Sequence, residues 1–239
     1  METAAVMQSS SDDVRRIASP LHTIILLAAE GVLVWRGVVR FQQMHSVGDV
    51  NRMQMYERTI LQEWLAFAFV ILGVWLAGSP LATVLGERWR SAGQVLRDIG
   101  IGVGFAILST LPLSVIGQLL GGRHADGVAR LILPHGPVEM ALWIALSVSA
   151  GICEETLFRG YLQRQFMALT KNVPSGILLS AVAFGAAHSY QGRAQAIVIG
   201  LEGALLGTMA YWRKSVRPGM IAHAWKDAMA PIFMSAMRH

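Results

Sequence analysis

Charged residues are scarce in this chain. Asp, Glu, Lys and Arg make up only 15% of the 239 residues, whereas a soluble domain usually has about a quarter. Hydrophobic residues make up 54%, and the mean hydropathy is +0.47. This composition excludes an ordinary soluble domain and predicts an integral membrane protein.

Cysteine is almost absent as well. The single Cys153 excludes an internal disulfide and a metal cluster built on cysteines. The net charge of +5 comes from basic residues that are scattered between apolar segments, as expected for loops that flank a membrane. Since these residues form no basic run, we do not expect nucleic acid as a partner.

Long apolar stretches dominate what is present. A membrane-spanning helix needs about 20 apolar residues, and seven segments could each form one. They are roughly 20–39, 61–85, 98–120, 137–158, 173–190, 194–212 and 217–237. The last four are shorter or carry charges, so we place them inside the bundle. We predict an all-α fold, a polytopic transmembrane helix bundle of about seven or eight helices over 20–239. A flexible N-terminal tail is expected at 1–19.

The N-terminal region also bears on topology. Arg15 and Arg16 precede an apolar run, as in a secretory signal, but Glu30 interrupts that run. We therefore expect a retained first transmembrane helix. The distribution of Lys and Arg between the loops weakly favours an N-terminus inside the cell. In that orientation Glu154 would lie at the cytoplasmic end of the fourth span.

Residues 153–159, CEETLFR, place three charges directly after the apolar run 138–152. Ionisable residues at membrane depth are costly and usually functional. Glu155 and Arg159 have i, i+4 spacing, so on a helix they can pair and play a supporting part. Glu154 points about 100° away around the helix. It is therefore the carboxylate left free for proton transfer.

Two further motifs with i, i+4 spacing follow, Phe184-x-x-x-His188 and His223-x-x-x-Asp227. If the histidines converge on Glu154, the three groups could activate a water, with Glu154 as general base and His188 assisting. Alternatively, Glu154, His188 and His223 could bind a divalent metal such as zinc. An ionised Asp227 cannot donate a hydrogen bond, so we expect it to orient His223 or to join a polar network. Phe184 is expected to pack against the site.

Several other residues in apolar segments have more than one interpretation. Glu202, in IGLEGALLG at 199–207, could be a partner of the charged cluster or make a structural hydrogen bond. Small residues such as Gly185 and Gly200 would allow close helix packing. Cys153 is expected to pack, because no neighbouring histidine in the sequence would activate it. His22 is expected at the surface.

The order EExxxR, FxxxH and HxxxD over about 137–230 resembles the CAAX prenyl endopeptidase and bacteriocin-processing family of intramembrane proteases, also called CPBP or Abi. The resemblance implies about eight transmembrane helices around a catalytic cavity that opens toward the cytosol. It implies either removal of the last three residues of a prenylated CAAX protein or processing of other membrane peptides. The site residues that it implies are a base, Glu154, with His188; an oxyanion pair, His223 and Asp227; and supporting Glu155 and Arg159.

The leading hypothesis is therefore a hydrolase that cuts a peptide bond near the C-terminus of a membrane-associated substrate, and a prenylated CAAX-type protein is one candidate. Asp227 departs from the family, whose prenyl proteases often have Asn there. The expected partners are the lipid bilayer and a peptide or lipidated protein. The expected location is the cell membrane of a bacterium or the endoplasmic reticulum of a eukaryote. The alternatives are an ion- or proton-coupled transporter that uses the same charged residues, and a non-catalytic scaffold or immunity protein.

Overall fold

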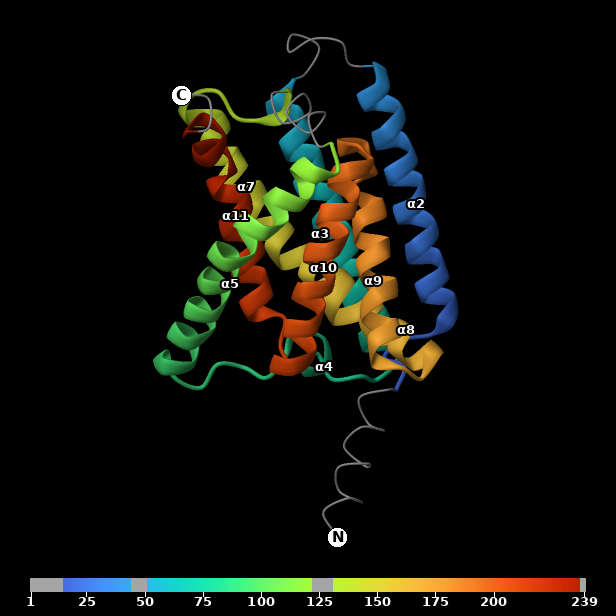
Figure 1. Ribbon diagram of the computed structural model, residues 1–239. Helices are drawn as coiled ribbons and strands as arrows, with labels where there is room; N and C mark the ends of the chain where they lie inside the picture. The colour runs from blue at the N-terminus through green and yellow to red at the C-terminus, as the bar shows by residue number, and fades with distance from the viewer. Residues whose placement is uncertain (1–14, 44–50, 122–130, 237–239) are drawn as a thin grey trace.

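Helices make up the regular structure of this protein, as the sequence predicted. The computed structural model describes residues 15–43, 51–121 and 131–236, and no strand occurs in those ranges. The helices, shown in Figure 1, are α2 (Pro20–Gln43), α3 (Arg52–Leu76), α4 (Ala82–Leu85), α5 (Ala92–Leu119), α7 (Gly136–Glu154), the π-helix η3 (Glu155–Leu162), α8 (Gln163–Thr170), α9 (Val173–Ala187), the 3-10 helix η4 (Ser189–Gln191), α10 (Arg193–Arg213) and α11 (Arg217–Ala236).

Among the described residues, four helical stretches are long and apolar enough to cross a membrane. They are Arg52–Leu76, Ala92–Leu119, Gly136–Thr170 and Arg193–Arg213. Large apolar side chains cover the outside of the bundle, and Trp75, Leu108 and Trp212 are among the most exposed. In water such a surface would be costly, whereas lipid chains solvate it. The chain is therefore a helical membrane bundle and an integral membrane protein.

Several predicted helix boundaries are wrong, and the largest differences lie in α3, which ends at Leu76, and in the helix that begins with α7. The segment expected at 61–85 is α3, which begins at Arg52, because the Asn51 side chain caps it by accepting a hydrogen bond from the Gln54 N–H (3.0 Å). The segment expected to end at 158 instead continues through η3 and α8 to Thr170. Most of the tail expected at 1–19 lies outside the described residues, although Ile17 and Ala18 at its end are buried.

The continuation past Glu154 is a π-helix, and its turns are wider than those of an α-helix. The Gln163 N–H bonds to the Phe158 carbonyl, five residues earlier, and that carbonyl also accepts from the Ser180 hydroxyl (2.7 Å). All eight residues of η3 are buried. Gly160 lets α4 approach closely, since a Cβ there would lie 2.6 Å from Val84 Cγ1. This segment is therefore the best enclosed part of the bundle.

His22 was expected at the surface, and this is wrong. Its Nδ1 lies 2.8 Å from the Tyr161 hydroxyl and its Nε2 lies 2.9 Å from the Phe69 carbonyl oxygen, while its ring stacks on Phe69. The Tyr161 hydroxyl is also 2.9 Å from the Thr23 hydroxyl. These contacts tie the start of α2 and the end of α3 to η3.

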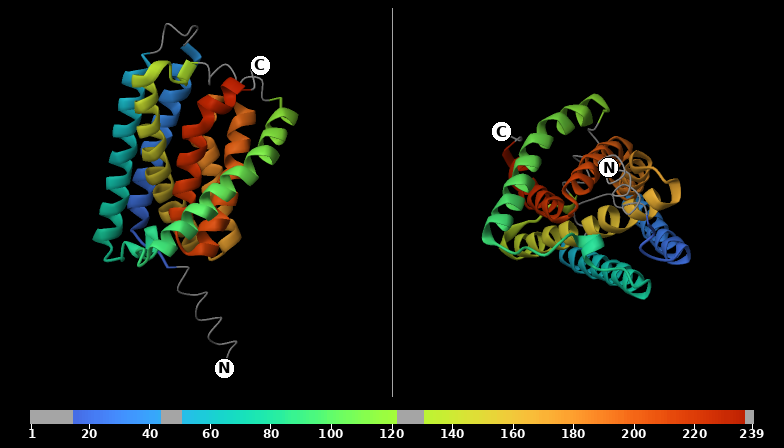
Figure 2. Two further views of the ribbon diagram at one scale, coloured as in Figure 1. Left: turned by 90° about the vertical axis from the view of Figure 1, so that its left-hand side faces the viewer. Right: turned by 90° about the horizontal axis from the view of Figure 1, so that it is seen from below.

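The bundle has two ends, which we name by the parts of the chain that lie there. At the N-terminal face are the start of α2, α4 and the end of α8; at the C-terminal face are the end of α2, the start of α7, η4 and the end of α11 (Figures 1 and 2). Helices α9 and α10 lie side by side, and α11 packs against α5 and α7. Helices α2 and α3 stand together at one side (Figure 2).

The α9–α10 contact predicts the effect of a single methyl group. A Cβ at Gly185 would lie 2.5 Å from the Ala196 carbonyl oxygen, so Gly185→Ala must push the two helices apart. We expect it to lower the free energy of unfolding by about 1–3 kcal/mol, measured as the thermal midpoint in detergent. Gly200→Ala is the matched control, because its Cβ would meet nothing nearer than 3.4 Å. Equal midpoints for both variants would contradict this packing.

Candidate active site

A large cavity lies in the half of the bundle nearer the C-terminal face. Its volume is about 1910 Å³, and its lining includes Arg40 and Gln43 at the end of α2, Gln118 at the end of α5, and Glu154 near the middle of the long α7–η3–α8 helix. The parts of α2, α3, α10 and α11 that line it all lie toward that same face. The cavity therefore extends from the middle of the bundle toward the C-terminal face.

The expected pair of Glu155 and Arg159 is present at the inner end of this cavity. Arg159 Nη1 donates to Glu155 Oε1 at 2.9 Å, and both side chains are almost fully buried. Phe184 packs as expected, because the Arg159 guanidinium lies over its ring, 4.0 Å from the centroid. Two glycines leave space for this ion pair. A Cβ at Gly219 would lie 2.9 Å from Glu155 Oε2, and a Cβ at Gly203 would lie 3.0 Å from Arg159 Nη2.

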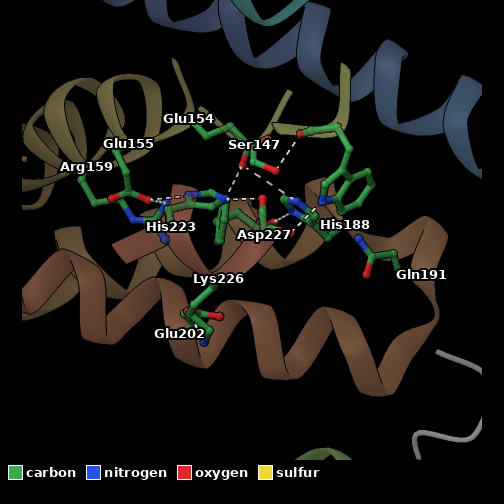
Figure 3. Close-up of polar contacts among 12 residues, drawn as sticks. Ser147, Glu154, Glu155, Arg159, His188, Gln191, Glu202, His223, Lys226 and Asp227 are labelled. Atoms are coloured by element: carbon green, nitrogen blue, oxygen red, sulfur yellow. Dashed lines mark hydrogen bonds and ion pairs between the residues drawn. The ribbon is translucent and has the colours of Figure 1, made fainter. Parts of the chain in front are cut away.

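Glu154, His188 and His223 come together from three helices (Figure 3). Glu154 Oε2 lies 3.9 Å from His188 Nε2 and 3.8 Å from His223 Nε2. Within the described parts of the chain this oxygen is buried and has no hydrogen-bond partner. The convergence that the sequence left as a condition is therefore met, and it leaves one carboxylate oxygen between two imidazoles.

The contacts of His188 fix the position of its proton. His188 Nδ1 lies 2.9 Å from the Phe184 carbonyl oxygen, which can only accept, so the hydrogen sits on Nδ1. In the neutral ring Nε2 then carries a lone pair, and that lone pair is on the side of Glu154. His188 can accept a hydrogen bond beside the carboxylate.

His223 has carboxylate oxygens at both nitrogens. Its Nδ1 lies 3.1 Å from Glu155 Oε1, and its Nε2 lies 3.4 Å from Asp227 Oδ2. An imidazole donates from both nitrogens only as the cation, so this position suits a positively charged ring. Asp227 is anchored in turn, because its carbonyl oxygen accepts from Trp143 Nε1 at 2.8 Å. Of the interpretations left open for Asp227, its contacts match the orientation of His223.

Glu202 is engaged elsewhere in the cavity wall. Its Oε1 lies 2.5 Å from Lys226 Nζ, and this ion pair joins α10 to α11. Figure 3 shows the pair set apart from Glu154 and the histidines. Glu202 therefore makes a structural contact with Lys226 and is not a direct partner of Glu154 or the histidines.

A metal site was one alternative for the same residues. Two imidazoles and a carboxylate are a donor set that zinc accepts, yet the described residues contain no group of three or more His, Cys, Asp or Glu arranged to hold a metal ion. Since both nitrogens of His223 already face carboxylates, the arrangement does not fit the metal, and we derive no step through one. Zinc stays a prediction.

Sequence reasoning missed one residue of the cavity, Glu63 on α3. Like Glu30 on α2, it lines the cavity. The signal was available, because Glu63 directly precedes the apolar run 64–77, and a charge beside such a run was the reason for singling out Glu154. It was overlooked because no motif surrounds it.

The comparison with known families supports the resemblance to CAAX prenyl endopeptidases. Residues 136–229 match the family model described as type II CAAX prenyl endopeptidase Rce1-like. We call this matched region, which covers less than half of the chain, the Rce1-like domain. This domain runs from α7 into α11 and contains all three motifs, whereas α2, α3 and α5 precede it. No curated protein and no solved structure matches the chain.

The buried pair in the Rce1-like domain predicts a large loss of stability when one partner is removed. Arg159→Met leaves the Glu155 carboxylate buried without its cation, which should cost about 3–5 kcal/mol. Arg90→Met is the control, because Arg90 and Glu87 form an exposed pair at 3.7 Å that is worth about 0–1 kcal/mol. Thermal unfolding in detergent measures both. Similar midpoints would show that the buried pair does not hold the bundle.

The cavity also brings two expectations into conflict. An N-terminus inside the cell places the N-terminal face in the cytoplasm, and the cavity then extends toward the outer face. The family resemblance instead implies a cavity open to the cytosol. Only one of these can hold, because the cavity and the start of α2 lie toward opposite ends of the bundle.

Labelling from one side of the membrane resolves the conflict. In a Cys153→Ala background, Glu87→Cys probes the N-terminal face and Arg193→Cys probes the C-terminal face. Following the positive-inside distribution, we expect an impermeant maleimide to label only Arg193→Cys in intact cells. Labelling of Glu87→Cys alone would indicate that the cavity extends toward the cytosol. Labelling of both variants would contradict the placement of these two residues at opposite faces of the bundle.

Proposed function

We propose that the protein is a multi-pass intramembrane endopeptidase that hydrolyses a peptide bond near the C-terminus of a membrane-associated substrate. A prenylated CAAX-type protein is the substrate class that we test first. The observation that carries the proposal is the position of Glu154 Oε2, 3.9 Å from His188 Nε2 and 3.8 Å from His223 Nε2, in the cavity of an Rce1-like domain. A scaffold would not need a buried carboxylate oxygen without a hydrogen-bond partner between two imidazoles.

Water is the nucleophile in this mechanism. A water bound between Glu154 Oε2 and His188 Nε2 would donate one hydrogen bond to each, because both atoms are acceptors. As the water oxygen attacks the carbonyl carbon, Glu154 takes the proton, and it then returns this proton to the departing amine. No acyl-enzyme forms. Cys153 is buried and is not needed as a nucleophile.

His223 supplies positive charge for the oxygen of the tetrahedral intermediate. Glu155 and Asp227 face its two nitrogens and stabilise the charged ring, and a fixed positive charge lowers the energy of a developing oxyanion. Asp227 acts through His223 and does not donate to the oxyanion itself. This assignment accommodates Asp227 where prenyl proteases often have Asn.

The walls of the cavity suit a lipidated peptide. Pockets for small ligands have volumes of about 300–1000 Å³, and this cavity, at about 1910 Å³, is larger. Its walls combine the charged centre with aliphatic side chains, including Leu33, Val34, Leu146, Leu157 and Val198. A peptide backbone at Glu154 and an acyl or prenyl chain along the apolar wall could therefore be held together.

The proposal predicts release of a tripeptide from a farnesylated CAAX peptide by the purified protein in detergent. Glu154→Gln removes the base but keeps the size of the side chain, so we expect the cleavage rate to fall about 10²–10⁴-fold. Glu87→Gln is the control, since Glu87 is exposed and lies at the N-terminal face. Mass spectrometry of the released peptide gives the rate.

Each other outcome has a defined meaning. Cleavage that survives Glu154→Gln would refute the role of this residue as base. No cleavage by the wild type would contradict the CAAX substrate and favour another peptide, ion-coupled transport or a scaffold. Activity lost on chelation and restored by zinc would establish the metal that the side-chain arrangement does not support.

A further inference from the structure

Glu63 is a second carboxylate with an unpartnered oxygen in the same cavity. It lies on α3, which packs against α7 but precedes the Rce1-like domain. Among the described residues, Glu63 Oε2 and Glu154 Oε2 are both buried and neither has a hydrogen-bond partner. Both side chains line the cavity. An ionised carboxylate oxygen that is buried without a donor is costly, so each of these oxygens needs a proton or a bound water.

The charges around Glu63 are mostly negative. Glu154 on α7 and Asp227 on α11 both act on it with the same sign, and His223 on α11 is the cation that opposes them. Glu30 on α2 adds to the negative charge at Glu154, and Cys153 is the other titratable group of α7 there. Among the other cations, Arg159 pairs with Glu155 and Lys226 pairs with Glu202. Arg36, Arg40 and Arg58 also line the cavity, and Tyr190 of η4 is a further titratable group that acts on Glu63.

The two carboxylates have unequal access to positive charge. Glu154 Oε2 lies 3.8 Å from His223 Nε2, which stabilises its ionised form. Glu63 makes no ion pair within the described residues. When like charges share a buried site, one of them tends to be neutralised by a proton, and here the group that makes no ion pair is the one that keeps it.

We propose that Glu63 and Glu154 act as a linked pair that holds one proton, carried by Glu63 in the resting state, which leaves Glu154 ionised as the base. Glu63 is a positioning residue, because it acts on the reaction through the charge of Glu154. The effect of Glu63 on the reaction rests on the proposed function, whereas the protonation of Glu63 does not. A helix outside the Rce1-like domain then sets the charge of the residue at the centre of that domain.

Infrared difference spectra test the proton without any substrate. A protonated carboxylic acid has a carbonyl-stretch band that an ionised carboxylate lacks. At neutral pH we expect Glu63→Gln to remove such a band from the wild-type spectrum. Glu57→Gln, on the exposed side of the same helix, should leave it unchanged. Glu154→Gln removes the repelling charge, so the Glu63 band should weaken. No change on Glu63→Gln would overturn the inference.

The pH profile of peptide cleavage tests the role. At high pH Glu63 ionises, and its negative charge makes the protonated Glu154 a weaker acid. The wild type should then lose activity, because Glu154 must return its proton to the departing amine. Glu63→Gln cannot ionise, so it should keep its activity to higher pH, while Glu57→Gln should follow the wild type. An identical profile for all three would overturn the role of Glu63. If the wild type cleaves no peptide, the proposed function fails, and the infrared result alone tests whether Glu63 and Glu154 share one proton.

Discussion

The contact between Glu155 and Arg159 is the interaction on which the rest of the site depends. One oxygen, Glu155 Oε1, accepts from Arg159 on the same turn and lies 3.1 Å from His223 Nδ1 on α11. The Arg159 guanidinium in turn lies on the ring of Phe184 in α9. A single buried carboxylate therefore links η3, α9 and α11. Since a buried ion pair stabilises only when it is well satisfied, these added contacts matter as much as the pair, although Glu155 Oε2 and Arg159 Nη2 have no hydrogen-bond partner among the described residues.

Because Glu155 is used in this way, its neighbour is left for the cavity. Successive residues of a helix point in different directions, so Glu154 faces His188 and His223 while Glu155 faces inward. The change from α7 to η3 occurs between these two residues. On the N-terminal side η3 is fully buried, and on the C-terminal side the cavity begins. The Glu154 carboxylate thus lies at the border between the buried core and the cavity, where a molecule in the cavity can reach it while the surrounding helix stays packed.

Spacing within a helix could be predicted from the sequence, whereas contacts between helices could not. The i, i+4 rule predicted the Glu155–Arg159 pair and identified Glu154 as the free carboxylate, because both depend only on helix geometry. The burial of His22 depends on Tyr161, 139 residues away, and no local pattern records it. The continuation of the helix past 158 follows from the π-turn in η3. The direction of the cavity needed the fold, since counts of basic residues concern loops and not the interior.

The charge balance of the cavity connects the two parts of the chain. The Rce1-like domain supplies both imidazoles, but α2 and α3 bring Glu30 and Glu63 to the same space. The side chain of His223 is held by Glu155 and Asp227, so a metal at this place would have to displace Asp227 from Nε2. Protons can balance the remaining carboxylates without moving any side chain. In the mechanism that we propose, the number of protons held between α3 and α7 therefore determines whether Glu154 can act as a base.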